Sequence, residues 1–136
     1  MKIGFIGLGN VGGKLAGSLL RNGFDLTVRD LNREIARPFL DGGAKWGESP
    51  KRMAETVDLI ITCLPNPAAS AVVMEAEDGI LAGLSSGNIW VEMSTTDEEE
   101  VKRLGAMVQE LGGEALDCPV SGGCHRAETG NISIFA

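Results

Sequence analysis

The sequence predicts an α/β protein with a doubly wound, mostly parallel sheet. Short apolar runs alternate with amphipathic stretches of helical periodicity along the chain, which is the pattern of repeated strand–helix units. The apolar runs are hydrophobic at nearly every position, and this is typical of strands that helices cover on both faces. A third observation is the glycine-rich turn directly after the first run, which allows a strand and a helix to pack closely.

The first half of the chain predicts three strands and three helices. The runs "KIGFI", "DLTVRD" and "DLIITCL" are short and apolar enough for strands, whereas the stretches between them have helical periodicity. Ser49 can cap the third helix, and Pro50 suits its first position because proline has no N–H to donate. In order, we expect a strand at 2–6, a helix at 11–22, a strand at 25–30, a helix at 33–42, a helix at 49–56 and a strand at 58–64.

The second half continues the alternation. Thr96 and Glu99 have the spacing of a capping box, and the acidic run at 97–100 lies where carboxylates favour a helix N-terminus. The alternative is that this run is an interaction patch. In order, we expect a helix at about 68–75, a strand at 88–93, a helix at about 97–111, a strand at 114–118 and a last strand at 131–135.

Composition and charge narrow the class of protein. The 136 residues suffice for one domain, and contents of 43% hydrophobic and 23% charged residues are typical of a folded protein. The net charge of −7 argues against nucleic acid as a partner. Cys63, Cys118 and Cys124 share no metal-ligand spacing, so we expect no metal site and reduced thiols in the cytoplasm. The first apolar run is too short and glycine-broken for a signal peptide or a membrane span.

A complete G-x-G-x-x-G pattern joins the first strand to the first helix. In such a turn the first glycine allows a tight bend, the second lets a pyrophosphate approach the backbone, and the third lets helix and strand pack closely. The helix N-terminus then offers free N–H groups to the phosphates. The pattern in this position predicts a dinucleotide-binding Rossmann domain. Its candidate cofactor-binding residues are Gly7, Leu8, Gly9, Asn10, Val11 and Gly12.

Asp30 ends the second expected strand, where the dinucleotide fingerprint places an acidic residue for the ribose hydroxyls. A carboxylate at this position repels a 2′-phosphate, so the sequence favours NAD over NADP. Two alternatives remain at this stage. Asp30 could be a turn residue only, and Arg29 and Arg33 could still bind a phosphate.

Three further stretches follow the glycine turn, namely "CLPNPAASAVV", "VEMSTTDEEE" and "DCPVSGGCHRAETGNISIF". With the opening "IGFIGLGNVGGKLAGSLLRNGFDLTVRD", they resemble the β-hydroxyacid dehydrogenase family, which includes 3-hydroxyisobutyrate, tartronate semialdehyde and 6-phosphogluconate dehydrogenases. Val11, Leu15 and Ser18 depart from the family's usual residues but keep volume or polarity. The resemblance covers essentially the whole chain and implies one NAD-binding domain over residues 1–136.

The resemblance also implies roles for residues in these stretches. It places Leu64 and Pro65 beside the adenosine ribose, although Pro65 could simply end its strand. It places Ser94 and especially Thr95 near the nicotinamide, although both hydroxyls could instead satisfy a helix N-terminus. Residues 117–130 match the family's substrate loop at eight positions, which are Asp117, Pro119, Val120, Ser121, Gly122, Gly123, Ala127 and Gly130. A hydroxyl and two glycine amides can hold a carboxylate against the nicotinamide, so the implied substrate-binding residues are Ser121, Gly122 and Gly123.

The residues after the two loop glycines bear on the substrate. In 6-phosphogluconate enzymes acidic residues typically occur there, whereas this chain has Cys124, His125 and Arg126. The difference favours a small β-hydroxy acid such as 3-hydroxyisobutyrate. As the chain's single histidine, His125 could act as a general acid or base, but the family uses no histidine here, so we expect it to be a solvated loop residue. Arg126 could steer a carboxylate.

In the family, a lysine on a helix beyond the nucleotide domain transfers the proton, and an all-α domain closes the site and supplies most of a dimer interface. None of the lysines here matches that position; they are Lys2, Lys14, Lys45, Lys51 and Lys102. We therefore expect a fragment without the all-α domain, with no catalytic residue of its own and negligible turnover. Three alternatives remain open: a non-catalytic dinucleotide-binding module or sensor, a fragment of a 6-phosphogluconate dehydrogenase-like NADP enzyme, and a subunit of an oligomer whose missing helices come from another chain.

Overall fold

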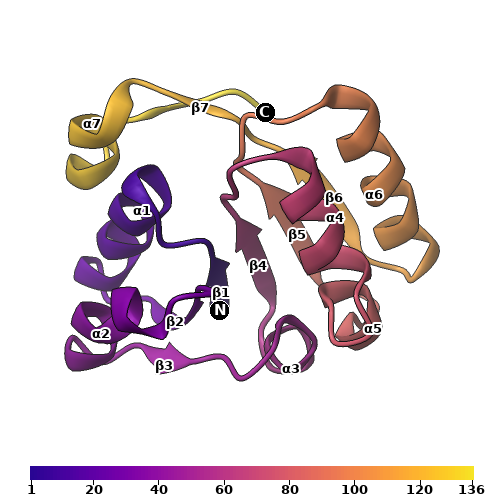
Figure 1. Ribbon diagram of the computed structural model, residues 1–136, viewed down its shortest axis with the longest axis horizontal. Helices are drawn as coiled ribbons and strands as arrows, with labels where there is room; N and C mark the ends of the chain where they lie inside the picture. Colours follow the sequence, from indigo (N-terminus) through magenta and orange to yellow (C-terminus); the bar gives the residue numbers. More distant parts are fainter.

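The computed structural model describes residues 1–136 and contains a six-stranded parallel sheet in the order β3-β2-β1-β4-β5-β6 (Figure 1). Helices cover both faces of this sheet, so the predicted doubly wound α/β fold is confirmed. The strands are β1 (Lys2–Ile6), β2 (Asp25–Arg29), β3 (Lys45–Trp46), β4 (Leu59–Thr62), β5 (Ile89–Glu92) and β6 (Glu114–Asp117).

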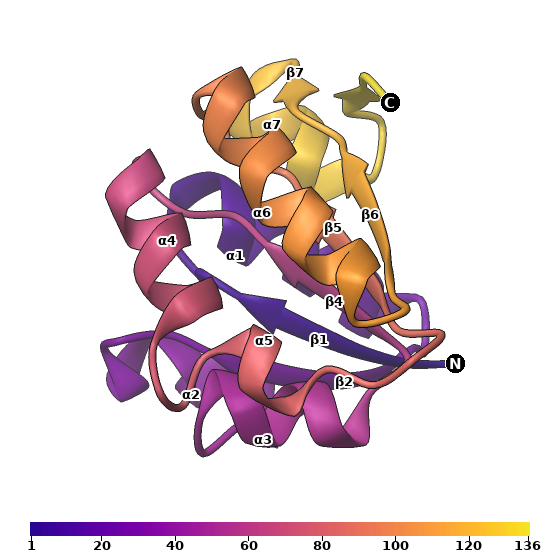
Figure 2. The same ribbon diagram turned by 90° about the vertical axis from the view of Figure 1, so that its right-hand side faces the viewer.

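Two apolar clusters hold the layers together, one on each face of the sheet. Figure 2 views the sheet with one layer of helices in front of it and the other behind it. Phe5 and Val28 belong to the face that α1 and α2 cover, and Trp90 and Leu104 belong to the face that α3 to α6 cover. All four side chains are inaccessible to solvent, and burial of such side chains is the main stabilising contribution. The helices are α1 (Asn10–Arg21), α2 (Arg33–Asp41), α3 (Pro50–Thr56), α4 (Pro67–Glu75), α5 (Ile80–Gly83), α6 (Glu98–Glu110) and α7 (Gly123–Thr129).

The strand order reverses at the centre of the sheet, where β1 pairs with β2 on one side and β4 on the other. In open α/β sheets a crevice forms at this reversal, outside the carboxyl ends of the strands. The position of a ligand site therefore follows from the topology.

The start of α6 differs from the capping box expected at Thr96 and Glu99. The N-cap is Asp97, whose carboxylate accepts from the Glu100 N–H at 3.1 Å. Because Asp97 stands one position closer to the first helical residue, it displaces Thr96 from that role. The Thr96 hydroxyl is left buried without a hydrogen-bond partner.

Replacement of Thr96 by valine is expected to stabilise the protein by about 1 kcal/mol, because valine has a similar shape and removes an unsatisfied buried hydroxyl. The melting temperature should rise by about 4 °C. Thermal unfolding followed by circular dichroism measures this. A lower melting temperature would show that the hydroxyl has a partner.

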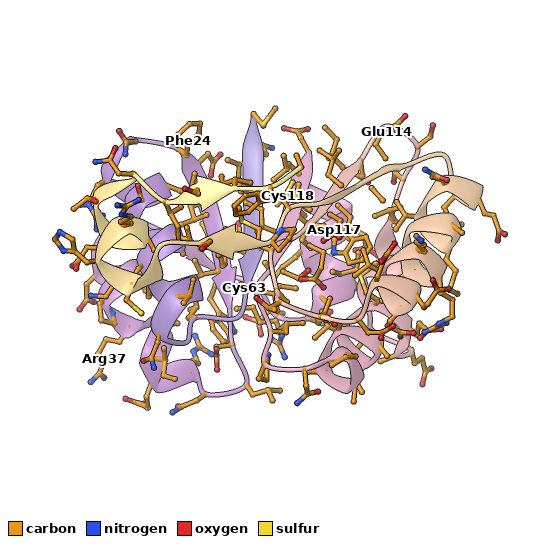
Figure 3. The ribbon with its side chains drawn as sticks, turned by 90° about the horizontal axis from the view of Figure 1, so that it is seen from above. Phe24, Arg37, Cys63, Glu114, Asp117 and Cys118 are labelled. Atoms are coloured by element: carbon orange, nitrogen blue, oxygen red, sulfur yellow. The ribbon has the colours of Figure 1, made fainter.

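Residues 119–136 form a segment that sequence reasoning described incorrectly. The expected last strand at 131–135 is reduced to β8 (Ser133–Ile134), which pairs antiparallel with β7 (Val120–Ser121) outside the main sheet. The expected glycine-rich loop contains α7, which was not predicted. Seen from above, this segment lies over the carboxyl edge of the sheet, beside α1 (Figure 3). Elements β3 and α5 were also missed, and both are short.

Helix α7 packs directly on α1. Ala127 is completely buried, Lys14 forms an ion pair with Glu128 at 3.2 Å, and the Arg21 guanidinium donates to the Glu128 carbonyl. The segment that follows β6 is thus fixed to the helix that starts at the glycine turn. None of the helices combines the length and the apolar character that crossing a membrane requires.

Candidate functional site

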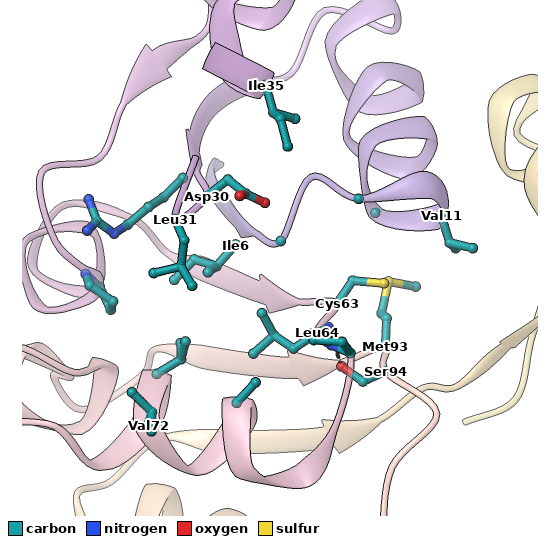
Figure 4. Close-up of a pocket in the computed structure, with 18 of the residues that line it drawn as sticks. Ile6, Val11, Asp30, Leu31, Ile35, Cys63, Leu64, Val72, Met93 and Ser94 are labelled. Atoms are coloured by element: carbon teal, nitrogen blue, oxygen red, sulfur yellow. Dashed lines mark hydrogen bonds between the residues drawn. The ribbon is translucent and has the colours of Figure 1, made fainter. Parts of the chain in front are cut away.

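A cleft of about 1010 Å³ lies at the carboxyl ends of β1, β2, β4 and β5, between α1, α2 and α4 (Figure 4). Its volume is at the upper end of the range for small-molecule sites. No group of three or more His, Cys, Asp or Glu side chains is arranged to hold a metal ion. Of the residues that the sequence nominated for the cofactor, those that line the cleft are Gly7, Gly9, Asn10, Val11, Gly12, Asp30, Leu64, Pro65 and Thr95.

The three glycines of the turn have different surroundings. A Cβ on Gly7, whose φ is +100°, would lie 2.1 Å from the Cys63 carbonyl oxygen, and one on Gly12 would lie 2.0 Å from the Gly7 carbonyl oxygen. Both positions therefore require glycine for the fold itself. A Cβ on Gly9 would meet no protein atom within 4 Å. The space beside Gly9 belongs to the cleft and is open to a ligand.

The N-terminus of α1 has no side-chain cap. Its N-cap is Gly9, which has no side chain to accept from the first-turn N–H groups. The corresponding positions of α2, α3, α4 and α6 carry Asn32, Ser49, Asn66 and Asp97, and each of these side chains accepts a backbone N–H. The donors and the positive dipole end of α1 thus remain for an anion in the cleft. This arrangement fits the pyrophosphate of a dinucleotide.

Asp30 lies directly after β2 and faces the glycine turn (Figure 4). One of its carboxylate oxygens accepts from the Leu8 N–H at 2.8 Å, and the other accepts from the Asn32 N–H at 3.0 Å. A carboxylate has about four lone-pair sites, so acceptor capacity remains for ligand hydroxyls. Leu8 itself is buried in the core and does not line the cleft. Its contribution to the site is the backbone bond to Asp30.

The two arginines near Asp30 are both engaged elsewhere. The Arg29 guanidinium donates to the carbonyls of Gly47 and Glu48 at 2.8 and 2.7 Å. The Arg33 guanidinium lies 5.1 Å from the centre of the Trp46 ring, a cation–π distance, and Arg33 does not line the cleft. Arg29 does line the cleft, so its side chain, held through Nη1 by these two carbonyls, and the Asp30 carboxylate both lie beside the ribose position.

Exposed apolar side chains line the cleft on its α2 side and on its α4 side, and sequence reasoning missed them. Leu31 is fully exposed, Val72 is 66% exposed and Ile35 is 40% exposed, and all three line the cleft. Such exposure is unfavourable unless a ligand covers it. Apolar side chains on two sides of a cleft suit a planar ring between them. Leu31 could have been nominated from the sequence, because it directly follows Asp30, the expected ribose-binding residue.

The far end of the cleft lies between the turns after β4 and β5. The Leu64 N–H donates to the Ser94 hydroxyl at 2.6 Å, which joins the two turns (Figure 4). Thr95 is exposed beside them. Cys63 and Met93 line the same end, and burial raises the pKa of the Cys63 thiol to about 11, with the Glu92 carboxylate adding to the rise.

Cys63 is therefore expected to resist alkylation at pH 8, whereas the exposed Cys124 should react. With a pKa of about 11, only about one thiol in a thousand is ionised at that pH. Mass spectrometry of peptides after brief iodoacetamide treatment measures the labelling of each cysteine. Equal rates at both cysteines would contradict the burial of Cys63.

The predicted substrate residues lie next to the cleft without lining it. Ser121 ends β7, Gly122 has φ of +130° at the N-cap of α7, and Gly123 has φ of +75° as its first residue. All three are exposed, and in this segment only Val120 lines the cleft. His125 and Arg126, both on α7, are exposed and lie outside the cleft.

Comparison with known proteins gives one family. The family described as the NAD binding domain of 6-phosphogluconate dehydrogenase matches residues 2–136. The mitochondrial 3-hydroxyisobutyrate dehydrogenase of Rattus norvegicus is 36% identical over 133 residues, which are 98% of this chain and 40% of that protein. The cytokine-like nuclear factor N-PAC of Xenopus tropicalis is 34% identical over 99% of this chain and 25% of that protein. The chain thus spans well under half the length of these curated relatives.

Solved structures agree with the sequence comparisons. Psf3 in complex with NADP+ and 2-OPP has a TM-score of 0.93 at 31% identity, over 97% of this chain and 47% of that one. The Mycobacterium tuberculosis 3-hydroxyisobutyrate dehydrogenase with L-serine has a TM-score of 0.87 at 26% identity, over 98% of this chain and 45% of that one. The resemblance inferred from the four motifs is confirmed.

Proposed function

Because the chain belongs to the family of the 6-phosphogluconate dehydrogenase NAD-binding domain, a family of dinucleotide-binding oxidoreductase domains, we propose that it binds NAD in the cleft and serves hydride transfer with a small β-hydroxy acid. The observation that carries this proposal is the uncapped N-terminus of α1 behind Gly9, where open space adjoins free N–H donors. When bound, NAD supplies the hydride chemistry, and the protein binds and orients it.

Different residues of the cleft would bind different parts of the cofactor. The first turn of α1 would hold the pyrophosphate, and Asp30 would accept from the adenosine ribose hydroxyls. Leu64 and Pro65 would border that ribose, and Thr95 would lie on the nicotinamide side. The exposed apolar side chains of Leu31, Ile35 and Val72 would cover the adenine from two sides.

We propose NAD as the preferred cofactor, with NADP as the weaker ligand. The Asp30 carboxylate would repel a 2′-phosphate, while Arg29 is bound to carbonyls and Arg33 stacks on Trp46. A solved relative carries NADP+, so the family's members are not uniform in this respect. The preference rests on this chain's own residues.

The proposed substrate site is the turn at Ser121, Gly122 and Gly123, which would receive the carboxylate of the hydroxy acid. Relatives named as 3-hydroxyisobutyrate dehydrogenases support a substrate of that size. No lysine lines the cleft, and three of them form surface ion pairs: Lys14 with Glu128, Lys45 with Asp25, and Lys102 with Glu98 and Glu99. We place the proton-transfer residue outside residues 1–136, in a longer protein of which this chain is a part.

A fluorescence titration with NADH, followed by an oxidation assay with NAD and 3-hydroxyisobutyrate, tests both parts of the proposal. We expect saturable NADH binding, tighter than NADPH binding, and negligible turnover by the 136-residue chain. Robust turnover would contradict the location of the proton-transfer residue. Lack of binding of either dinucleotide would contradict the cofactor assignment.

A non-catalytic dinucleotide-binding module is the second candidate, because a relative that matches 99% of this chain is named as a nuclear factor. The longer protein distinguishes the two candidates: oxidation of a β-hydroxy acid by it supports the enzyme, and NADH binding without any turnover supports the module.

Compartment and assembly are also proposals. All three cysteines are unpaired, which supports a reducing compartment, and we propose the cytoplasm, although several relatives are mitochondrial by name. We also propose a homo-oligomer, which analytical ultracentrifugation would detect.

A further inference from the structure

Glu92 is a fully buried carboxylate at the end of β5, and it lies behind the cleft rather than in its lining. It forms no ion pair with any Lys, Arg or His, since none of the salt bridges of the chain includes it. Burial of a carboxylate is costly unless hydrogen bonds compensate it. The hydrogen bonds of the Glu92 carboxylate therefore indicate its role.

All hydrogen bonds to this carboxylate come from segments that form the cleft. One oxygen accepts from the backbone N–H and the hydroxyl of Ser94, in the turn after β5. The other accepts from the hydroxyl of Ser70 on α4 at 3.0 Å. The Ser94 hydroxyl in turn accepts from the Leu64 N–H at 2.6 Å, in the turn after β4. One side chain thus joins α4 and both turns.

The backbone of Glu92 extends the connection to a fourth segment. Its carbonyl accepts from the Cys118 N–H at 2.7 Å, directly before the β7–α7 segment that carries the proposed substrate turn. The side chain and backbone of this residue therefore lie at the junction between the cofactor half of the site and the substrate half.

We propose that Glu92 is a positioning residue, which holds the Leu64 and Ser94 turns at the separation that dinucleotide binding requires. The proposal rests on the proposed function for its ligand and on the observed hydrogen bonds for its geometry. Glu92 itself touches no cofactor. It fixes the Ser94 hydroxyl, and this hydroxyl fixes the Leu64 backbone.

Three variants separate positioning from general stability. Glu92→Met removes every acceptor but keeps the side-chain length. Glu92→Gln keeps an oxygen for Ser94 and removes the charge. The matched control is Thr62→Val, which removes the buried 2.9 Å bond from the Trp90 indole to the Thr62 hydroxyl on the same two strands. Thr62, like Glu92, is buried, but its hydroxyl bonds to no segment of the cleft.

The first readout is amide hydrogen exchange of Leu64 by NMR, which needs no cofactor. We expect Glu92→Met to accelerate it at least about tenfold, because loss of a buried hydrogen-bond partner has effects of that size. Glu92→Gln and Thr62→Val should leave it within about twofold. Unchanged Leu64 exchange in Glu92→Met, or equal acceleration in Thr62→Val, would overturn the proposal.

The second readout is NADH affinity, with the melting temperature measured in parallel. Glu92→Met should weaken NADH binding at least about tenfold, whereas Thr62→Val should lower the melting temperature and leave affinity unchanged. If wild type binds no dinucleotide, the proposed function fails, but the exchange readout still decides the role of Glu92. If Glu92→Met does not fold, Ser70→Ala replaces it, since it removes one hydrogen bond to the carboxylate without altering Leu64, Ser94 or the cleft lining. Unchanged Leu64 exchange together with unchanged NADH affinity in that variant would overturn the proposal.

Discussion

Replacement of Gly9 by alanine is expected to weaken NADH binding by at least about tenfold while the melting temperature stays within about 2 °C of wild type. The added methyl group meets no protein atom within 4 Å, and the φ of Gly9 is −68°, which alanine adopts without strain. Its only possible conflict is with a ligand that approaches the backbone at the start of α1. Fluorescence titration and thermal unfolding measure the two quantities separately.

Gly12→Ala is the matched comparison, because it adds the same methyl group three residues further along the same turn, at a position where protein atoms leave no room. That methyl carbon would lie 2.0 Å from the Gly7 carbonyl oxygen, so β1 and α1 would have to separate. We expect destabilisation of at least about 3 kcal/mol. Wild-type NADH affinity in Gly9→Ala would contradict the position of the pyrophosphate, and an unchanged melting temperature in Gly12→Ala would contradict the packing.

Asp30→Asn is expected to raise the affinity for NADPH relative to NADH by at least about tenfold, since it removes a negative charge beside the position of the 2′-phosphate. Both affinities can fall together, because the Leu8 and Asn32 N–H groups bond to the carboxylate oxygens. The ratio of the two dissociation constants, measured by titration, therefore reports the effect of the lost charge. A fall common to both affinities reports the weakened hydrogen bonds of the turn.

Glu34→Gln is the control for Asp30→Asn. Glu34 also carries a carboxylate, but it is exposed on α2, lies 3.9 Å from Arg37 and does not line the cleft. The ratio of NADPH to NADH affinity should be the same as in wild type. An unchanged ratio in Asp30→Asn, or an equal change in both variants, would remove Asp30 from the ribose site.

Local sequence patterns were sufficient for the sheet and for the glycine turn. The apolar runs of β1, β4 and β5 are continuous because both faces of each strand are covered, and the turn at Gly7 to Gly12 depends on contacts within one strand–helix unit. Both kinds of signal are contained in a few neighbouring residues.

Features that depend on distant contacts could not be predicted in this way. Helix α7 begins with two glycines of positive φ, and its packing on α1, through Ala127, stabilises it against a weak local propensity. Asp97 and Thr96 are both residue types favoured at an N-cap, so the local sequence did not determine that Asp97 would take this role. Glu92 gave no local signal, because its partner Ser70 lies 22 positions away along the chain, and Leu64, which it reaches only through the Ser94 hydroxyl, lies 28 positions away.

An NMR titration of the ¹⁵N-labelled 136-residue chain with NADH tests the central claim most directly. The account predicts saturable shift changes at the amides of Gly9, Asn10, Leu64 and Ser94, with smaller changes at the distant α6 surface. Absence of saturable changes up to about 1 mM NADH, or changes confined to residues outside the cleft, would contradict the claim that this cleft is a dinucleotide site.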